Sequence, residues 1–238
     1  MATSFSEPKL KAFPIRPRSP ALARLLQSCV VILAINWCAQ GMRGMDGKEL
    51  SFRLLLEGLV AFLLTMAMTS PLGAPAALAA ALLIAHSLSF TLNGQAWVCA
   101  RYCRWYRRDP AVLEAHLRRL VQRLQALGWL REAVCIGSLG RRGAITGDRA
   151  DLDLRLLFPP GVAGWLRVNL LLLRLRAEAL FRRIPLDLYA YARPERLRRF
   201  DQREPLLILH TIPGVFSHNL EENTRPLVIN PQIHRRFP

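Results

Sequence analysis

GSLGRRGAITGDRADLD, running from Gly137 to Asp153, is the stretch that decides the fold of this chain. A short apolar run, 133–136, comes before it, and a second apolar run, 154–158, follows it. Runs of this length and composition predict buried strands. The stretch therefore predicts a strand, a glycine-serine turn, a polar connection and a second strand that opens with two aspartates.

The two aspartates of the second strand, Asp151 and Asp153, stand two positions apart. Side chains alternate between the two faces of a strand, so both carboxylates should share one face. The leucines at 152, 154 and 156 should then point to the opposite face, into a core. Two carboxylates this close repel each other unless a cation lies between them. Hard oxygen ligands suit Mg²⁺, so the pattern predicts a divalent-metal site.

A third aspartate, Asp187, lies inside the apolar run 184–191, which predicts another strand. A lone carboxylate in an apolar strand destabilises the fold unless it has a partner. If this strand lies beside the one that opens with Asp151 and Asp153, three carboxylates converge. That number is enough to hold two divalent ions against a nucleoside triphosphate.

This ordered set resembles the nucleotidyltransferase superfamily of the polymerase-beta type. The family pattern is an apolar strand, Gly-Ser, a gap of about ten residues, Asp-apolar-Asp and a third Asp on a later strand. In this chain twelve residues separate Ser138 from Asp151. The resemblance covers 109–191, and it departs from the family at Ala150, where many relatives have Ser or Asn.

The resemblance implies an α/β (α+β) domain, a small mixed sheet flanked by helices. It implies that Asp151, Asp153 and Asp187 are catalytic and bind two Mg²⁺ ions, or Mn²⁺ in their place. It also implies that an NTP is the substrate and that Gly137 and Ser138 hold its triphosphate. Nearby arginines either neutralise the developing charge or are simply solvated: Arg141, Arg142 and Arg149.

Two other interpretations of the same residues stay open. In the first, the chain is a catalytically inactive relative that keeps the nucleotide pocket. In the second, Asp151 is a turn residue that begins a strand and Asp153 is a solvated surface residue. The second interpretation does not explain Asp187 in the middle of an apolar strand.

The composition combines a strong positive charge with a high apolar content. The formal net charge is +16 and 52% of the residues are hydrophobic, with a mean hydropathy of +0.18. This combination favours a membrane protein with a basic soluble part over a basic soluble protein. The five cysteines show no zinc-like spacing, so we expect reduced thiols in a cytosolic environment.

Two apolar segments, 52–69 and 72–92, approach or reach the length of about 20 residues that a transmembrane helix needs. They predict a transmembrane helical hairpin whose connector carries no charge. Residues 1–53 hold eight Lys or Arg, and 93–108 hold further arginines. The positive-inside rule therefore predicts that both flanks, and with them the catalytic domain, lie on the cytoplasmic face of a bacterial-type inner membrane or plasma membrane. A buried hairpin inside a globular domain is the alternative.

The predicted organisation has three parts. Residues 1–21 form a basic disordered arm, 22–108 a membrane anchor, and 109–238 the nucleotidyltransferase-like domain. The anchor includes 22–39 as an interfacial helix or a weak span. Its last segment, 93–108, mixes aromatics with arginines, which favours the lipid headgroup layer over nucleic acid. A basic helix at 161–183 is either solvated or rests on anionic lipid.

The predicted function is a membrane-anchored, metal-dependent nucleotidyltransferase. It would move an NMP from an NTP to an unknown membrane-associated acceptor (lipid, glycan or protein) and release pyrophosphate. Membrane lipid is thus an expected partner. One alternative is a non-catalytic nucleotide-binding sensor or scaffold. Another is an enzyme that acts on RNA or makes a second messenger, although nucleic acid is the less expected partner because no RNA-binding domain is visible.

Overall fold

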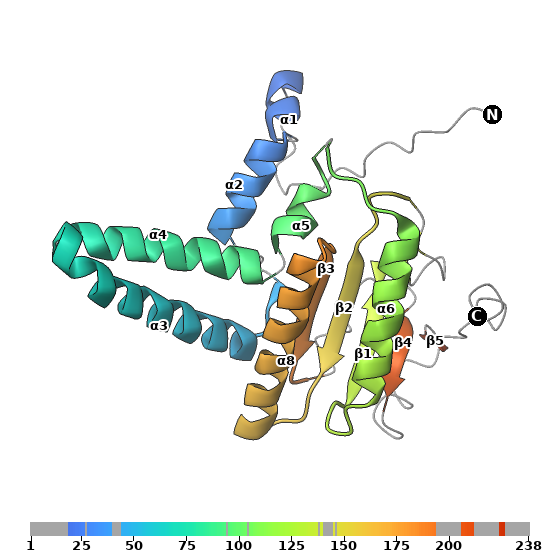
Figure 1. The fold of residues 1–238 in the computed structure, drawn as a ribbon. Helices are drawn as coiled ribbons and strands as arrows, with labels where there is room; N and C mark the ends of the chain where they lie inside the picture. Colours follow the sequence, from blue (N-terminus) through green and yellow to red (C-terminus); the bar gives the residue numbers. More distant parts are fainter. Residues whose placement is uncertain are drawn as a thin grey trace.

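The computed structural model describes residues 19–26, 28–39, 44–93, 95–103, 105–137, 139, 145, 147–193, 206–211 and 224–226. It has a small α/β domain and a long helical hairpin that projects from the domain (Figure 1). The elements in chain order are α1 Pro20–Leu26, α2 Cys29–Ala39, α3 Gly47–Leu72, α4 Ala74–Leu92, α5 Gln95–Ala100, α6 Pro110–Gln125, β1 Glu132–Ile136, β2 Leu152–Leu157, α8 Val162–Phe181, β3 Leu186–Tyr191, β4 Leu206–Thr211 and β5 Thr224–Pro226.

The sheet is mixed and has the strand order β3-β2-β1-β4-β5. β1 is antiparallel to both β2 and β4, while β2 runs parallel to β3 and β4 runs parallel to β5. Parallel neighbours need a crossover connection, and α8 supplies it between β2 and β3. The predicted mixed α/β class is confirmed. Its nucleotidyltransferase-like detail stays a prediction.

One face of the sheet carries the main hydrophobic core. α6 and α8 cover this face (Figure 1), and the leucines at 152, 154 and 156 lie fully buried beneath them. The predicted inward direction of these leucines is therefore confirmed. α6 begins as predicted, because the Asp109 side chain accepts a hydrogen bond from the Ala111 N–H at 2.9 Å and Pro110 opens the first turn.

The opposite face of the sheet has a smaller cover. Val134, Ile136, Leu157, Tyr189 and Tyr191 pack there with Met45, which precedes α3. By strand alternation this is the face that Asp153, Arg155 and Asp187 share. The acidic residues thus lie away from the helices that form the main core.

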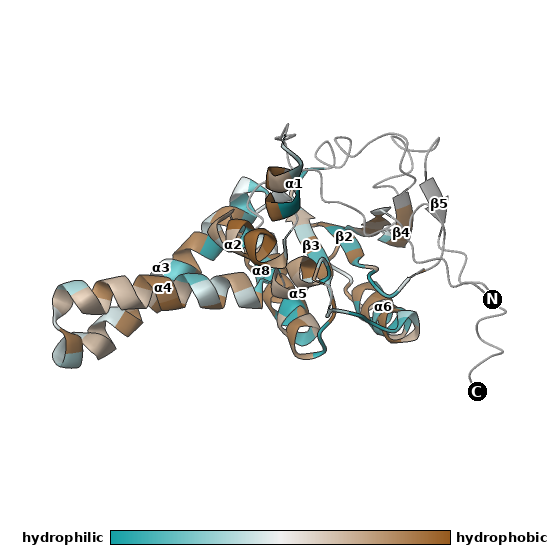
Figure 2. Ribbon diagram, turned by 90° about the horizontal axis from the view of Figure 1, so that it is seen from above, coloured by the Kyte–Doolittle hydropathy of each residue, from teal (hydrophilic) through white to brown (hydrophobic). Residues whose placement is uncertain are grey.

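The hairpin is formed by α3 and α4, with Gly73 as the single residue between them. The backbone of Gly73 has a φ angle of +77°. Both helices are long and apolar enough to cross a membrane, and most of the hairpin ribbon in Figure 2 has white to brown, apolar colours. The two predicted spans are confirmed by length and composition, while the side of the membrane stays a prediction. The axes of α1 and α2 meet at an angle of 61°. If these two helices together formed one bent span, they would be a third candidate membrane span.

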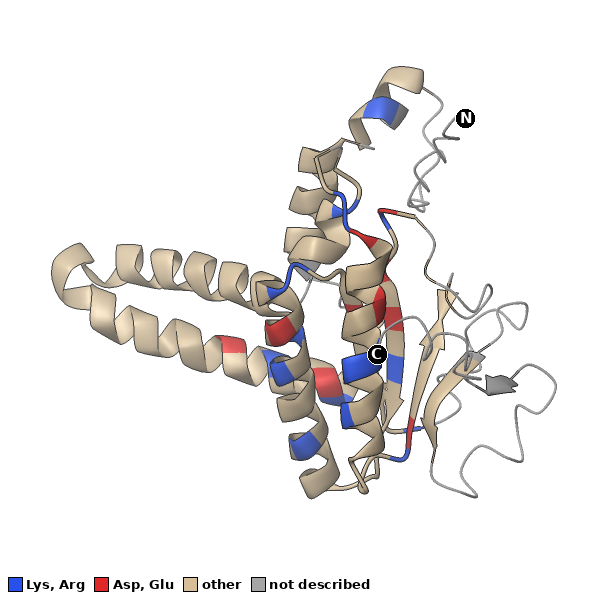
Figure 3. Ribbon diagram, turned by 45° about the vertical axis from the view of Figure 1, so that its right-hand side comes forward, with Lys and Arg blue, Asp and Glu red and all other residues tan. Residues whose placement is uncertain are grey.

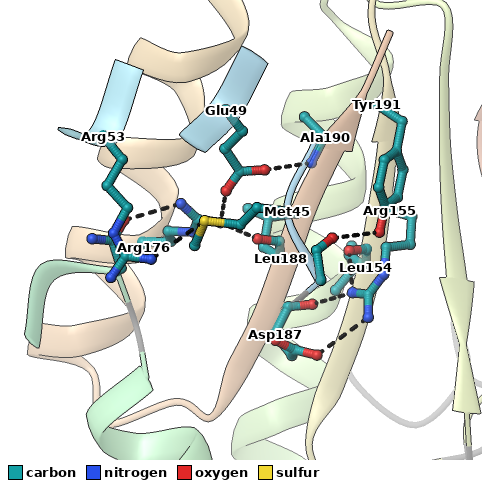
Figure 4. Close-up of polar contacts among 12 residues, drawn as sticks. Met45, Glu49, Arg53, Leu154, Arg155, Arg176, Asp187, Leu188, Ala190 and Tyr191 are labelled. Carbon is teal, nitrogen blue, oxygen red and sulfur yellow. Dashed lines mark hydrogen bonds and ion pairs between the residues drawn. The ribbon is translucent and has the colours of Figure 1, made fainter. Parts of the chain in front are cut away.

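α3 begins five residues earlier than the sequence suggested, and its first turn attaches the hairpin to the sheet. Asp46 caps the helix by accepting from the Lys48 N–H at 3.3 Å. Glu49 binds Arg176 of α8 at 2.5 Å and accepts the Ala190 N–H of β3 at 3.1 Å. Figure 4 shows both Glu49 contacts. These contacts cross the predicted domain boundary at 108/109.

The aromatic segment after α4 packs on the C-terminal end of α8. The Trp97 indole N–H donates to the Leu180 carbonyl at 2.9 Å, and the Tyr106 hydroxyl donates to the Arg183 carbonyl at 3.0 Å. Trp97 and Tyr106 thus supply hydrogen-bond donors to carbonyls at the helix end. The expected position of this segment in the headgroup layer stays a prediction. Trp105 is 65% exposed.

α8 also differs from the predicted basic helix at 161–183. Arg176 is buried rather than part of a solvated or lipid-contacting basic face, and Leu166 and Leu170 are exposed. Residues on another side of the helix pack on the sheet: Val168, Leu172, Leu175 and Ala179. The helix is apolar on two sides, so periodicity alone did not identify the side that meets the sheet.

Two of the cysteines are joined in the structure. Cys29 at the start of α2 forms a disulfide with Cys103, after α5, with a Cα–Cα distance of 5.0 Å. The expectation of reduced thiols is wrong for this pair, which brings together segments 74 residues apart. Cys38, Cys99 and Cys135 do not take part in a disulfide. Disulfides are typical of oxidising compartments, so this pair counts against the predicted cytoplasmic placement.

Candidate functional site

The predicted acidic residues lie at one end of two neighbouring strands. β2 and β3 pair in parallel with Asp153 directly opposite Asp187, and Asp151 immediately precedes β2. The expectation that the strand of Asp187 lies beside the Asp151–Asp153 strand is therefore confirmed. Figure 3 shows acidic positions gathered at this end of the strands, with basic positions close by.

The glycine of the predicted phosphate-binding turn lies against this acidic cluster. The last residue of β1, Ile136, is opposite Asp153 in the antiparallel β1–β2 pair, and Gly137 follows with φ +77°. A Cβ atom at this position would lie 2.7 Å from the Asp153 Oδ2 atom. Both the backbone conformation and the close approach require glycine.

The rest of the predicted nucleotide-binding set falls outside the part of the chain that the structure describes. Ser138, Arg141 and Arg142 lie outside the described residues, so their roles stay predictions. Arg149 is described and half-buried, in the turn before β2. Of the predicted nucleotide-binding set, Gly137 is the described member that contacts the acidic cluster.

Two arginines that the sequence analysis did not single out pair with the acids. Arg101 forms an ion pair with Asp151. The Arg155 Nη2 atom lies 3.2 Å from the Asp187 Oδ2 atom, and its Nη1 atom donates to the Asp187 carbonyl at 2.9 Å, contacts that Figure 4 shows. Arg155 was detectable, because it follows Asp153 by two positions and so shares its face. Arg101 comes from 50 residues before Asp151 and has no local signal.

The pKa values of the two arginines reflect these pairs. Burial alone lowers the pKa of each guanidinium. Asp151, Tyr102 and Asp153 together more than offset it for Arg101, and Asp187, Tyr191, Asp153 and Tyr189 together do so for Arg155. The net pKa of both arginines is therefore raised, and both stay charged. Two of the three carboxylates consequently have a permanent positive partner.

Asp153 is in a different electrostatic position from its neighbours. Burial raises the pKa of its carboxyl well above the ordinary value, and repulsion from Asp151 and Asp187 raises it further. A carboxyl that is desolvated and placed between two other acids favours its neutral form unless a cation compensates it. The cluster has three acids against two paired arginines, and Asp153 is the position where added positive charge would stabilise most.

The donor set fits a divalent ion in kind but is not assembled as a metal site. Carboxylate oxygens are the ligands that Mg²⁺ prefers. Among the residues that the structure describes, however, no group of three or more His, Cys, Asp or Glu side chains is arranged to hold a metal ion. Arg101 and Arg155 instead pair with Asp151 and Asp187. Ligation by all three acids would require at least Arg101 to withdraw.

Comparison of the chain with protein-family models, with curated proteins and with solved structures found no match. The nucleotidyltransferase resemblance therefore depends on the residues themselves. These are the turn at 137–138, the Asp151–Asp153 pair and Asp187.

One aromatic ring connects the acidic cluster to the base of the hairpin. The Arg155 guanidinium lies 4.7 Å from the centre of the Tyr189 ring, and the Arg176 guanidinium lies 5.8 Å from the same centre. Arg155 holds Asp187, and Arg176 holds Glu49 of α3. The candidate site and the hairpin thus share a continuous set of contacts through β3.

Proposed function

We propose that this chain is a membrane-anchored, metal-dependent nucleotidyltransferase that moves an NMP from an NTP to a membrane-associated acceptor. The observation that carries the proposal is the β2–β3 register, which sets Asp153 opposite Asp187 beside Asp151. The close approach of Gly137 to Asp153 supports it, since the predicted phosphate-binding turn and the predicted metal ligands meet.

The proposed reaction is a displacement at the α-phosphorus of the NTP. A hydroxyl oxygen of the acceptor forms a bond to that phosphorus, the bond to the bridging oxygen of the β-phosphate breaks, and pyrophosphate leaves. Divalent ions held by Asp151, Asp153 and Asp187 would lower the pKa of the acceptor hydroxyl and neutralise the triphosphate.

The remaining residues of the site prepare it for that substrate. Arg155 orients Asp187 through one contact to its carboxylate and one to its backbone carbonyl. Gly137, without a side chain, lets the Asp153 carboxylate lie against the backbone of the predicted phosphate-binding turn. Arg101, released from Asp151 when the site fills, becomes available to an anionic group.

A non-catalytic, membrane-tethered nucleotide-binding module is the second candidate function. The Arg101–Asp151 ion pair favours it, because an internal guanidinium already compensates one of the proposed metal ligands. In this case the chain would bind a nucleotide without releasing pyrophosphate.

The discriminating experiment uses the full chain in native membranes with Mg²⁺ and NTPs labelled at the α-phosphate. Transfer predicts label in a lipid, glycan or protein fraction, together with pyrophosphate, and Asp153→Asn should abolish both. Asp148→Asn is the matched control, because Asp148 carries the same charge in the turn before β2 but its side chain is 52% exposed. Nucleotide binding without transfer supports the binding module, and labelled RNA supports an enzyme that acts on RNA.

The side of the membrane is tested separately. We expect the Gly73 connector outside the cytoplasm and Asp187 inside, because the charged flanks surround an uncharged hairpin tip. Single cysteines introduced at these positions, after replacement of the native ones, can be labelled with an impermeant thiol reagent. Labelling near 187 from outside would contradict nucleotidyl transfer, because NTPs are cytosolic, and it would agree with the Cys29–Cys103 disulfide.

A further inference from the structure

A cavity of about 240 Å³ lies where the hairpin meets α8. Its apolar lining comes mainly from the hairpin, with Leu56 and Val60 of α3, Leu88 of α4 and Leu173 of α8. Pockets for drug-sized ligands hold roughly 300–1,000 Å³, so this cavity suits part of a chain rather than a whole lipid. Since α3 and α4 are both candidate membrane spans, the apolar molecules nearest to it are lipids.

The charged residues that line the cavity balance each other. Arg53 and Arg176 face two acids, Glu49 and Glu57. Glu49 holds Arg176 at 2.5 Å, and the Arg53 Nε atom donates to the Ser89 hydroxyl at 3.2 Å. An anionic headgroup would be repelled by the two carboxylates, and a cationic headgroup would be repelled by the two guanidiniums. The lining therefore favours an uncharged polar group.

Two polar atoms of the lining residues have unmet hydrogen-bonding capacity. Glu57 uses its Oε1 atom for the His86 Nδ1 atom, 2.9 Å away, but its Oε2 atom is buried and has no hydrogen-bond partner among the described residues. The Arg176 Nε–H is likewise buried without a partner there. One atom accepts and the other donates, and a hydroxyl group can both donate and accept.

We propose that this cavity binds a neutral membrane lipid that carries a free hydroxyl group. The hydroxyl donates to Glu57 Oε2 or accepts from Arg176 Nε, and the start of one hydrocarbon chain lies along Leu56, Val60 and Leu88. The site goes beyond the proposed nucleotidyl transfer and needs neither NTP nor metal, so it stands or fails independently of that activity.

The test uses the full chain in phosphatidylcholine nanodiscs, without NTP or Mg²⁺, and a diacylglycerol with a photoreactive group in one acyl chain. Crosslinking should concentrate on 52–60 and 85–92, and unlabelled diacylglycerol should compete while phosphatidic acid with the same chains does not. Val60→Trp, which fills the cavity, should reduce the crosslinking about tenfold. Phe62→Trp should leave it unchanged, because Phe62 lies on an exposed part of α3, outside the lining.

A second pair of variants tests the hydroxyl contact. Glu57→Leu should weaken diacylglycerol binding about tenfold, whereas Glu57→Gln, which keeps an acceptor oxygen, should weaken it less. If Val60→Trp fails to fold, Leu88→Trp fills the same cavity from α4. Two results would overturn the proposal. One is crosslinking of the Phe62 region as strong as that of 52–60, which would indicate only lipid around the hairpin. The other is competition by phosphatidic acid as strong as that by diacylglycerol.

Discussion

Two groups of acids in this chain, one buried and one half-buried, have opposite surroundings. Glu49, at the base of the hairpin, has a partner for each carboxylate oxygen: Arg176 for Oε1 and the Ala190 N–H for Oε2. The acids at the ends of β2 and β3 crowd one another, and Asp153 is destabilised in its charged form by both neighbours. A satisfied buried network fixes a structure, whereas an unfavourable cluster marks a position that a ligand can stabilise.

The charge balance makes the same distinction. Glu49 forms its ion pair with Arg176, and both partners are almost fully buried. Three aspartates share Arg101 and Arg155, so the strand-end cluster keeps an excess of negative charge when all are ionised. We therefore expect removal of an acid to destabilise the first group and, without metal, to relieve the second.

The largest expected effect is on transfer activity in Asp153→Asn. If Asp153 is a metal ligand, nucleotidyl transfer should fall by more than about 100-fold, since metal-assisted charge stabilisation is lost. Mg²⁺ with an NTP should raise the melting temperature of the wild-type chain but not of this variant. The metal-free variant should be as stable as the wild type or more stable, because the repulsion is relieved.

Each alternative gives a different thermal-shift series for Asp153→Asn and Asp187→Asn. An inactive relative predicts a wild type that does not respond to metal. Solvated structural acids predict variants that are neutral or destabilised with or without Mg²⁺. Asp148→Asn controls for the loss of one negative charge near the site. A wild type without any response to Mg²⁺ and NTP would remove the catalytic proposal first.

The next largest effect is on stability in Glu49→Ala. This change leaves Arg176 buried without its partner, which should cost about 3–5 kcal/mol of unfolding free energy. Glu114→Ala removes an exposed pair with Arg118 and should cost less than about 1 kcal/mol. Chemical denaturation of both variants in mild detergent measures the difference. Equal small losses would mean that Glu49 does not join the hairpin to the sheet.

Glu132 of β1 is a further buried acid, and the pH dependence of stability tests the comparison there. Both its carboxylate oxygens are buried without partners among the described residues, and burial raises its pKa to about 8. The folded chain thus binds this proton more tightly than the unfolded chain, whose glutamate pKa is about 4.3. Stability from this group is complete below about 4.3 and is lost as pH rises toward about 8. Glu132→Gln should abolish that loss, so denaturation midpoints from pH 4 to 9 should fall less steeply than in the wild type.

His116 of α6 should give the smallest effect on stability, and its pH dependence should have the opposite sign to that of Glu132. Neither ring nitrogen has a partner among the described residues, and burial lowers its pKa to about 4. Its contribution to stability is complete above about 6.5 and is lost as pH falls toward about 4. The stability of His116→Leu relative to the wild type should therefore be highest near pH 4, as measured by denaturation midpoints at pH 4 and pH 8. A variant that is destabilised equally at pH 4 and pH 8 would contradict this assignment.

Local patterns predicted the parts of the molecule that depend on neighbouring residues. Alternation predicted the shared face of Asp151 and Asp153 and the buried leucines between them, and apolar length predicted the hairpin. A further local signal was present but unused, because Asp46 followed three residues later by Glu49 is typical of a helix start and marks the first turn of α3.

Contacts between distant segments could not be predicted in this way. The Arg101–Asp151 pair and the Cys29–Cys103 disulfide join segments at least 50 residues apart, and no repeated pattern relates their members. The buried side of α8 was also undetermined, since the helix is apolar both toward the sheet and at exposed positions such as Leu166. Pairing of this kind is settled by which surfaces meet in three dimensions.

The first turn of α3 has one more consequence, for the open side of β3. This strand ends the sheet, and its unpaired backbone groups could template pairing with another chain. Side chains occupy three of those groups: Arg176 at the Leu188 carbonyl, Glu49 at the Ala190 N–H and Asp46 at the Ala192 N–H. Asp46 and Glu49 at the start of α3 therefore protect this edge from pairing with another chain. A chain that begins between α4 and α6 would lack both residues, and the edge of β3 would be open to a strand of another molecule.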